Sequence, residues 1–346
     1  MRAAVFQGPG LLHKIEDIPM PSPSARQVLI QVERCGICGS DITMGKARAG
    51  PNPLGEAYDA IFAPGKVLGH EISGCVVGVG KDVERLKVGD RIAPMAISGC
   101  ATCAGCLSGN PLWCSGADML MGGYGQFALA NEYHSALLPP ELSMESGALI
   151  EPMATSLHAV ALSEMKPNSR IIVLGAGALG LGIVHFARRA GAGMIAAVAR
   201  SPARESLALA VGADIYKTQS CTLAEELADI MGGPADIVFE AAGAPGLIAQ
   251  GIQCVGPNGK IVTAGICSEP ESNFHIAAIT KQVKIQYSTA YTLDEFEVVV
   301  RLLRDPINPL NLLVSQTTSL EDFPAVFDAL CKGGAHTKVL VNPLGT

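Results

Sequence analysis

The chain has 346 residues, of which 49% are hydrophobic and 16% charged, and its net charge is −7. This composition supplies enough apolar side chains for two packed domains and excludes a disordered chain. The negative charge argues against non-specific attraction to nucleic acid or to acidic membranes.

The N-terminus lacks the apolar stretch of a signal peptide, and no stretch is apolar for long enough to span a membrane. The most apolar stretch, residues 171–191, is broken by glycines and then by Arg188 and Arg189. We therefore expect a cytoplasmic protein. In a reducing compartment, its eleven cysteines are expected to be metal ligands or buried thiols rather than disulfides.

The first part of the chain is predicted to be rich in short strands. Apolar, β-branched runs at residues 27–36, 71–80 and 88–96 each end near glycine or proline. Such spacing is typical of a small barrel or sandwich, which we expect to occupy residues 1–157.

From about Arg170 the pattern changes to alternating strands and helices. Strands are predicted at 170–175, 194–199, 235–243 and 259–266, with helices at 178–192 and 202–213 between the first three. This alternation predicts a doubly wound parallel sheet. Helices are expected again at 293–305 and 320–333, followed by a closing strand at 337–343. No repeat or low-complexity linker separates the two parts.

Four cysteines fall within fifteen residues: Cys100, Cys103, Cys106 and Cys114. Their spacing, C-x2-C-x2-C-x7-C, lets one loop supply the tetrahedral thiolate set that zinc requires. A ferredoxin run would have a final gap of three followed by proline, whereas here the gap is seven and Ser115 follows, so an iron–sulfur site is the minor alternative. Four free thiols are the remaining alternative. A closed four-cysteine site leaves no open coordination position, so this zinc would be structural.

A second group of metal-type residues is spread over three short motifs. CGICGSD holds Cys35, Cys38, Ser40 and Asp41, GHE holds His70 and Glu71, and LIEP holds Glu151. Each motif alone is a weak signal, and the C-x-x-C pair could also be a redox dithiol. Together, one cysteine, one histidine and one carboxylate leave a fourth position open for water or substrate, as a catalytic zinc requires. The remaining histidines are interpreted as structural or surface residues: His13, His134, His158, His185, His275 and His336.

A glycine-rich turn follows the strand predicted at 170–175. The motif G-x-G-x-x-G is formed by Gly175, Ala176, Gly177, Ala178, Leu179 and Gly180. Because it follows an apolar strand and opens a helix, it indicates a dinucleotide site in which the pyrophosphate rests on the helix N-terminus.

The second strand of this region ends without the acid that binds the ribose of NAD. Ala199 stands at that position, and Arg200, Ser201 and Arg204 follow. An arginine binds a 2′-phosphate that an acid would repel, so we predict NADP rather than NAD. The alternative is that both arginines are solvated surface residues. Asp214 is assigned to the next turn and not to the ribose.

The order of these motifs closely resembles that of the zinc-dependent medium-chain alcohol and polyol dehydrogenases. The resemblance runs over nearly the whole chain, through CGICGSD, GHEISG, VGDRI, the four-cysteine loop, LIEPMA and GAGALG. The EP pair after the cysteine loop is similar to the sorbitol-dehydrogenase-like branch.

The resemblance implies a fold and a set of zinc ligands. It implies a GroES-like catalytic domain formed by residues 1–157 and 292–346, with a Rossmann domain, residues 158–291, inserted between them. It implies that Cys38, not Cys35, is a ligand of the catalytic zinc and that His70 is the second. For the third ligand it implies Glu71 or Glu151, between which the zinc can exchange.

The sequence departs from the family pattern at two points. Thr43 stands where the family often has the histidine that ends a proton relay, which puts the relay beyond Ser40 in doubt. The gap between Cys38 and His70 is longer than usual, and we expect its residues 46–66 to lie near the substrate entrance.

The sequence thus predicts an oxidoreductase that transfers a hydride between NADP(H) and a secondary alcohol, polyol or diol, or the matching ketone. Cys38, His70, Glu71 and Ser40 are the expected catalytic residues, with Ser40 relaying the hydroxyl proton or, alternatively, making a local turn hydrogen bond. Two zinc ions per chain and a homodimer or homotetramer are expected. The alternatives are a non-catalytic NADP-binding sensor or structural protein stabilised by zinc, a zinc-ribbon nucleic-acid module, and a zinc-free quinone reductase.

Overall fold

The computed structural model describes residues 1–46, 56–272, 275–333 and 336–345. The chain forms two compact units, one of Met1–Glu151 with Thr292–Thr346 and one of Pro152–Tyr291. The boundaries between these units lie at 151/152 and 291/292, while the predicted domain boundaries at 157/158 and 291/292 stay a prediction. The first one falls inside a continuous helix, α4 (Met144–Ser163), so no turn or glycine marks it in the sequence.

The first unit is built on a seven-stranded sheet in the order β16-β17-β3-β4-β5-β9, with β8 also paired to β3. The strands of this sheet are β3 (Gln27–Gly36), β4 (Glu71–Val79), β5 (Arg91–Pro94), β8 (Phe127–Asn131), β9 (Ser135–Leu137), β16 (Val314–Ser319) and β17 (Lys338–Asn342). Two short pairs accompany it, β1 (Arg2–Val5) with β2 (Lys14–Asp17), and β6 (Ile97–Ser98) with β7 (Asp118–Met119). The pairing of β17 with β3 incorporates the last strand into the sheet of the N-terminal segment.

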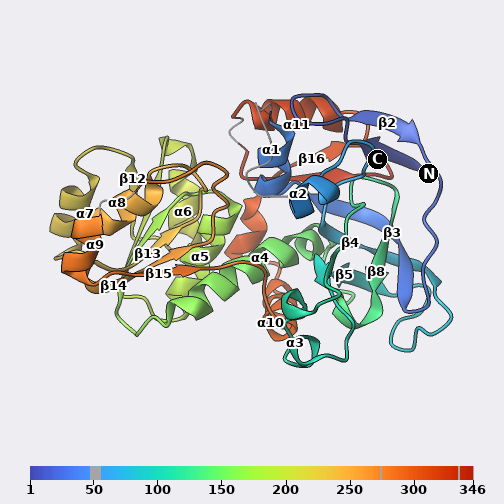
Figure 1. Ribbon diagram of the computed structural model, residues 1–346, viewed down its shortest axis with the longest axis horizontal. Coiled ribbons are helices and arrows are strands. Elements are labelled where there is room, and N and C mark those ends of the chain that lie inside the picture. Colours follow the sequence, from blue (N-terminus) through green and yellow to red (C-terminus); the bar gives the residue numbers. More distant parts are fainter. Residues whose placement is uncertain (47–55, 273–274, 334–335, 346) are drawn as a thin grey trace. The chain divides into compact units, whose positions relative to one another are not determined.

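The other elements of this unit are short helices around the sheet (Figure 1). They are α1 (Gly39–Gly45), α2 (Glu56–Ile61), α3 (Ala104–Leu107), the 3₁₀ turns η1 (Pro111–Trp113) and η2 (Glu132–His134), α10 (Leu293–Leu303), η4 (Pro309–Leu313) and α11 (Phe323–Cys331). The hydrophobic core lies between the sheet and α11, where Phe323 and Phe327 pack beside Tyr124 and Phe6. Of the expected entrance segment 46–66, residues 47–55 lie outside the described residues.

The second unit is a six-stranded parallel sheet, which confirms the predicted doubly wound fold. Its order is β12-β11-β10-β13-β14-β15, the strand order of a dinucleotide-binding fold. The strands are β10 (Arg170–Leu174), β11 (Met194–Ala199), β12 (Ile215–Thr218), β13 (Ala235–Glu240), β14 (Val255–Thr263) and β15 (Lys284–Tyr287). The chain order reverses between β10 and β13, where such sheets bind their ligands.

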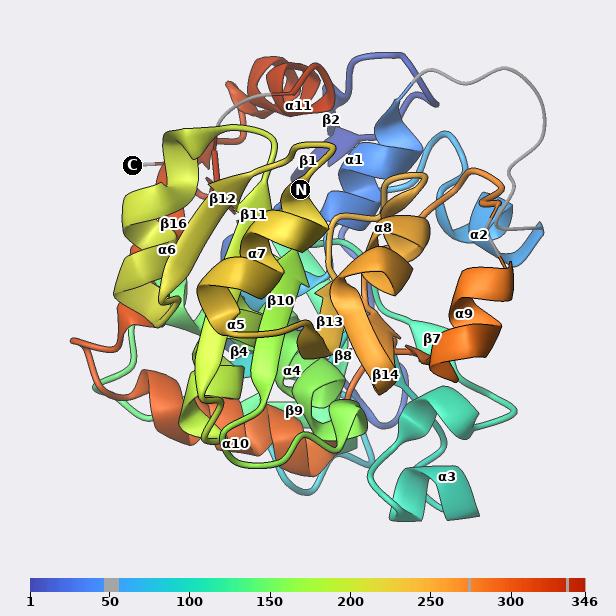
Figure 2. The same ribbon diagram turned by 90° about the vertical axis from the view of Figure 1, so that its left-hand side faces the viewer.

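The helices of this unit form two groups, and within each group each helix packs on the next one along the chain. In one group α5 (Ala178–Arg189) packs on α6 (Glu205–Val211), which follows the turn η3 (Pro202–Arg204). In the other, α7 (Leu223–Met231), α8 (Leu247–Cys254) and α9 (His275–Lys281) lie side by side, and α7 and α8 are seen in front of the strands in Figure 2. A core of buried aliphatic side chains fills the space between α7, α8 and the sheet. No helix among the described residues is long and apolar enough to cross a membrane.

Candidate metal and nucleotide sites

The ends of two paired strands bring the first set of metal-type residues together. Gly36, the last residue of β3, pairs with Glu71, the first residue of β4, so that Cys38 just after β3 and His70 just before β4 become neighbours. Ligand atoms of Cys38, His70 and Glu71 all lie within 4.8 Å of one another. His70 and Glu71 are buried, whereas Cys38 is half-buried, so the cluster is reached from the side of the thiol.

Glu71 is held by a buried lysine that the sequence analysis did not identify. The Lys338 ammonium donates to both carboxylate oxygens of Glu71 at 2.7 Å and to the carbonyl of Ile37 at 3.0 Å. Both side chains are at least 96% buried, since their exposed fractions are 4% and 0%. A side chain at Gly36 would place its Cβ 1.9 Å from Oε2 of Glu71, so the last residue of β3 must be glycine for this carboxylate to fit.

A second buried carboxylate, that of Asp41, lies near His70 without a hydrogen bond to it. Nδ1 of His70 lies 3.8 Å from Asp41, and Asp41 accepts a 2.5 Å hydrogen bond from the hydroxyl of Tyr124. Burial lowers the pKa of His70, but the charges of Asp41 and Cys38 outweigh it and hold that pKa well above its usual range. The pocket therefore stabilises positive charge. Asp41 also accepts from the backbone N–H of Cys38, at 3.4 Å, and so supports the loop that carries this cysteine.

The other two expected residues of this site lie close by without joining the cluster. Glu151, on α4, acts electrostatically on both His70 and Lys338, although its oxygens are not within the 4.8 Å group. The hydroxyl of Ser40 is buried and has no hydrogen-bond partner among the described residues. The local turn hydrogen bond considered for Ser40 is thus not made.

The residues present fit a zinc ion. A thiolate sulfur, an imidazole and a carboxylate are the ligands that zinc prefers, and three protein ligands leave one position for a reacting oxygen. Nε2 of His70 is the nitrogen left for a metal, because Nδ1 faces Asp41.

The four cysteines of the second cluster also converge. Sulfur atoms of Cys100, Cys103, Cys106 and Cys114 all lie within 4.8 Å of one another, brought together by α3 and η1. Backbone N–H groups of Cys103, Cys100 and Gly116 donate to sulfur at 3.3–3.4 Å. These hydrogen bonds stabilise thiolates, and those from Thr102 and Cys103 lower the pKa of the Cys100 thiol. The cluster fits the structural zinc that its spacing predicts.

The glycine-rich turn lies at the carboxyl end of β10, with Gly177 as the N-cap of α5. A Cβ at Gly180 would lie 1.8 Å from the carbonyl oxygen of Gly175, so helix and turn approach as closely as the motif requires. A Cβ at Gly177 would meet no atom within 4 Å. Open space above this glycine, at the start of a twelve-residue helix, fits a pyrophosphate.

The two arginines after β11 differ in burial and in contacts. Arg204 donates to the carbonyl of Ala176, at 3.4 Å, so its guanidinium lies against the glycine-rich turn, and Arg200 is exposed and acts electrostatically on it. Burial and the charge of Arg200 both lower the pKa of Arg204. Tyr216 fixes the loop between them by donating to the carbonyl of Ser201 at 2.6 Å. Asp214 accepts from the N–H of Ile195, near the amino end of β11, and so lies away from the nucleotide edge.

Glu240, at the carboxyl end of β13, is a buried residue of this edge that the sequence analysis missed. Its carboxylate accepts from the N–H groups of Ala242 and Gly243, at 2.8 and 2.7 Å, and burial raises its pKa. Gly175 packs against Ala242, so Glu240 shapes the loop beside the glycine-rich turn. The feature of the sequence that could have identified Glu240 is an acidic residue directly at the end of an apolar strand.

Comparison with known proteins matches both units. A family model described as "Alcohol dehydrogenase GroES-like domain" matches residues 24–140, and one described as "Zinc-binding dehydrogenase" matches residues 178–305. The (R,R)-butanediol dehydrogenase of Bacillus subtilis (strain 168) is 32% identical over 336 residues, covering 95% of this chain and 96% of the relative. The chain belongs to the zinc-dependent medium-chain alcohol and polyol dehydrogenases.

Further relatives place this dehydrogenase beside polyol-oxidising members of the family. A sorbitol dehydrogenase of Bacillus subtilis (strain 168) is 30% identical over 351 residues, covering 99% of this chain and 97% of the relative. A solved structure described as a zinc-binding dehydrogenase from Sinorhizobium meliloti 1021 bound to NADP has a TM-score of 0.85 and 26% identity, with 99% of both chains covered. The predicted GroES-like and Rossmann architecture of the dehydrogenase is confirmed.

Proposed function

We propose that this dehydrogenase carries one catalytic and one structural zinc and transfers a hydride between NADP(H) and a secondary alcohol, polyol or diol, or the matching ketone. The observation that carries the proposal is the convergence of Cys38, His70 and Glu71 within 4.8 Å in a pocket that stabilises positive charge. A non-catalytic sensor would need neither an open coordination position nor the unpaired hydroxyl of Ser40. The names of its relatives, butanediol and sorbitol dehydrogenase, favour polyols and vicinal diols.

Each residue of the cluster has a separate task. Zinc, when bound, supplies a Lewis acid that stabilises the alkoxide form of a substrate hydroxyl. Cys38 and His70 would hold the ion, and Glu71 or Glu151 would supply the carboxylate ligand. Asp41, which accepts a hydrogen bond from Tyr124, places a negative charge beside the ring of His70. Oγ of Ser40, which has no competing partner among the described residues, would take the proton of the substrate hydroxyl while its own hydroxyl proton passes to the ribose of the bound cofactor.

The preference for NADP rests on the position of Arg204 against the glycine-rich turn and of Arg200 beside it. Charge-assisted hydrogen bonds contribute about 1.5–3 kcal/mol, which corresponds to roughly tenfold or more in binding per arginine. We expect the double variant Arg200→Ala/Arg204→Ala to raise the KM for NADPH at least tenfold and to leave the KM for NADH nearly unchanged. Steady-state kinetics with both nucleotides measure this, with exposed Arg189→Ala as the control. A wild-type enzyme that prefers NADH would contradict the assignment.

The proposed reaction is tested by metal counting together with a substrate panel. We expect about two zinc ions per chain by mass spectrometry of the metal content, and turnover of at least one vicinal diol or polyol with NADP. One zinc per chain and no hydride transfer to any alcohol or from any ketone would instead favour the sensor.

Two further properties belong to this proposal. None of the eleven cysteines forms a disulfide in the described residues, which suits a reducing compartment, and a cytoplasmic location remains our prediction. A homodimer or homotetramer remains a prediction.

A further inference from the structure

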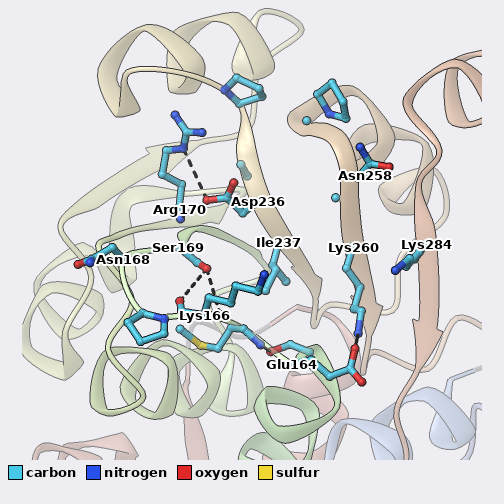
Figure 3. A pocket seen from close by; sticks show the side chains of 18 residues that line it. Glu164, Lys166, Asn168, Ser169, Arg170, Asp236, Ile237, Asn258, Lys260 and Lys284 are labelled. Atoms are coloured by element: carbon cyan, nitrogen blue, oxygen red, sulfur yellow. Dashed lines mark hydrogen bonds and ion pairs between the residues drawn. The ribbon is translucent and has the colours of Figure 1, made fainter.

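The second unit has a hollow of about 550 Å³ at the amino-terminal edge of its sheet, where Arg170 opens β10 (Figure 3). Its two acids are paired, Glu164 with Lys260 at 2.6 Å and Asp236 with Arg170 at 3.7 Å, and its other two lysines are exposed. Among these described residues no buried, unpaired charge is left for a ligand. Buried polar groups that act on the proposed metal ligands lie instead in the first unit, around Tyr124.

Gly123 and Tyr124 lie directly against the turn that precedes β4, although none of the motifs found in the sequence includes them. The N–H of Gly123 donates to the carbonyl of Gly69 at 2.9 Å. The N–H of Tyr124 donates to the carbonyl of Leu68 at 3.0 Å. Because Gly69 directly precedes His70, these two hydrogen bonds fix the backbone that carries the imidazole.

The ring of Tyr124 holds the same turn from one side. A Cβ at Gly69 would lie only 2.7 Å from Cδ1 of this ring, and the φ angle of Gly69 is 91°. A residue other than glycine would meet both the ring and a strained backbone at this position. Tyr124 is fully buried, and its ring centroid lies 4.5 Å from that of Phe323, so close packing keeps the ring against the turn.

The hydroxyl of Tyr124 reaches the loop that carries the other proposed ligand. It donates at 2.5 Å to Oδ2 of Asp41, and the same oxygen accepts from the backbone N–H of Cys38 at 3.4 Å. Asp41 is fully buried in the first turn of α1, whose N-cap is Cys38. A hydrogen bond to an ionised acceptor is among the strong ones, and a buried carboxylate that loses it is left unsatisfied. The hydroxyl therefore anchors the acid that caps the Cys38 loop.

We propose that Tyr124 is a positioning residue of the catalytic zinc site. Its hydroxyl acts on the Cys38 loop through Asp41, and its ring fixes the turn before His70. One side chain thus sets the separation of the two ligands. This inference rests on the proposed function, since it needs the catalytic zinc. A group that orients metal ligands typically changes metal affinity or activity 10–100-fold when it is removed.

The test is Tyr124→Phe, which removes the hydroxyl and keeps the ring. We expect the affinity of the catalytic site for zinc, measured by competition with a chelator, to fall roughly 10–100-fold. The absorption bands of cobalt in this site should shift, because the sulfur of Cys38 is displaced. A residue that only filled the core would change neither, since phenylalanine fills the same space.

The matched control is Tyr133→Phe, which removes a hydroxyl of the same unit that accepts from Arg26 and belongs to neither metal cluster. It should leave the zinc affinity and the cobalt spectrum unchanged. The four-cysteine cluster should bind zinc equally in both variants. That retention, together with circular dichroism, confirms that each variant is folded.

Asp41→Asn, alone and combined with Tyr124→Phe, tests whether the hydroxyl acts through this carboxylate. We expect the loss of zinc affinity in the double variant to be smaller than the product of the two single losses, because both changes weaken the same hydrogen bond. A loss equal to that product would overturn the proposal, as would unchanged affinity and spectrum in Tyr124→Phe beside a wild type that holds two zinc ions. A wild type that binds one zinc per chain would overturn the proposed function, and this inference with it.

Discussion

Cys38→Ser is expected to reduce turnover by at least about 10³-fold and to lower the zinc content from two ions per chain to one. A catalytic zinc contributes several kcal/mol to the barrier, and each 1.36 kcal/mol is a factor of ten in rate. Serine is a poor zinc ligand, so the cluster with His70 and Glu71 would lose its metal. The measurement is steady-state kinetics on the best substrate of the panel, paired with metal counting.

The matched control for this variant is Cys221→Ser, which changes an exposed thiol of the nucleotide-binding unit. It should retain two zinc ions and full turnover. The four-cysteine cluster should keep its zinc in both variants, since it shares no residue with the catalytic cluster. Substantial turnover by Cys38→Ser protein that holds a single zinc per chain would remove Cys38 from the catalytic site.

Lys338→Met is expected to destabilise the zinc-free protein by about 3–5 kcal/mol, the typical cost of leaving a buried charge without its partner. The ammonium of Lys338 is the only cation that an ion pair or hydrogen bond places on Glu71 among the described residues, and it binds both carboxylate oxygens at 2.7 Å. Urea unfolding of zinc-free protein, followed by circular dichroism, measures the loss. Protein with unchanged stability would show that the pair contributes little.

The double variant Lys338→Met/Glu71→Gln separates the charge from the packing. It removes both charges and should recover much of the stability that Lys338→Met loses, because no uncompensated ion remains.

In cobalt-loaded protein the absorption spectrum of the metal should differ between the wild type and Lys338→Met, since Glu71 is then free to approach the ion. An unchanged spectrum would show that releasing Glu71 from Lys338 does not alter the ligands of the metal.

The motifs that predicted the four-cysteine cluster and the glycine-rich turn are short and continuous in the sequence. Three steps of two or seven residues bring the four cysteines into one loop, and strand, glycine-rich turn and helix are consecutive around Gly177. The cluster of Cys38 with His70 was predicted by resemblance, and its physical origin is the antiparallel pairing of β3 with β4. Element ends were less accurate: the strand expected at 235–243 ends at Glu240, and the helix expected at 320–333 is α11, Phe323–Cys331.

The features that were missed depend on contacts between distant segments. Lys338 is 267 residues from Glu71, and a lysine in an apolar strand carries no local signal of the acid that it will meet. The strand β12 is short and half-exposed, so its apolar pattern is weak.

The position of Lys338 on the last strand has a consequence for how the enzyme is made. Glu71 and the neighbouring thiol and imidazole leave the ribosome long before β17, whose Lys338 neutralises that acid. Until β17 has been synthesised and has paired with β3, Glu71 lacks the ammonium that neutralises it. The Glu71–Lys338 pair therefore forms later than the strand pairing that brings Cys38 beside His70, and a chain cut before Lys338 would leave this carboxylate without its balancing charge.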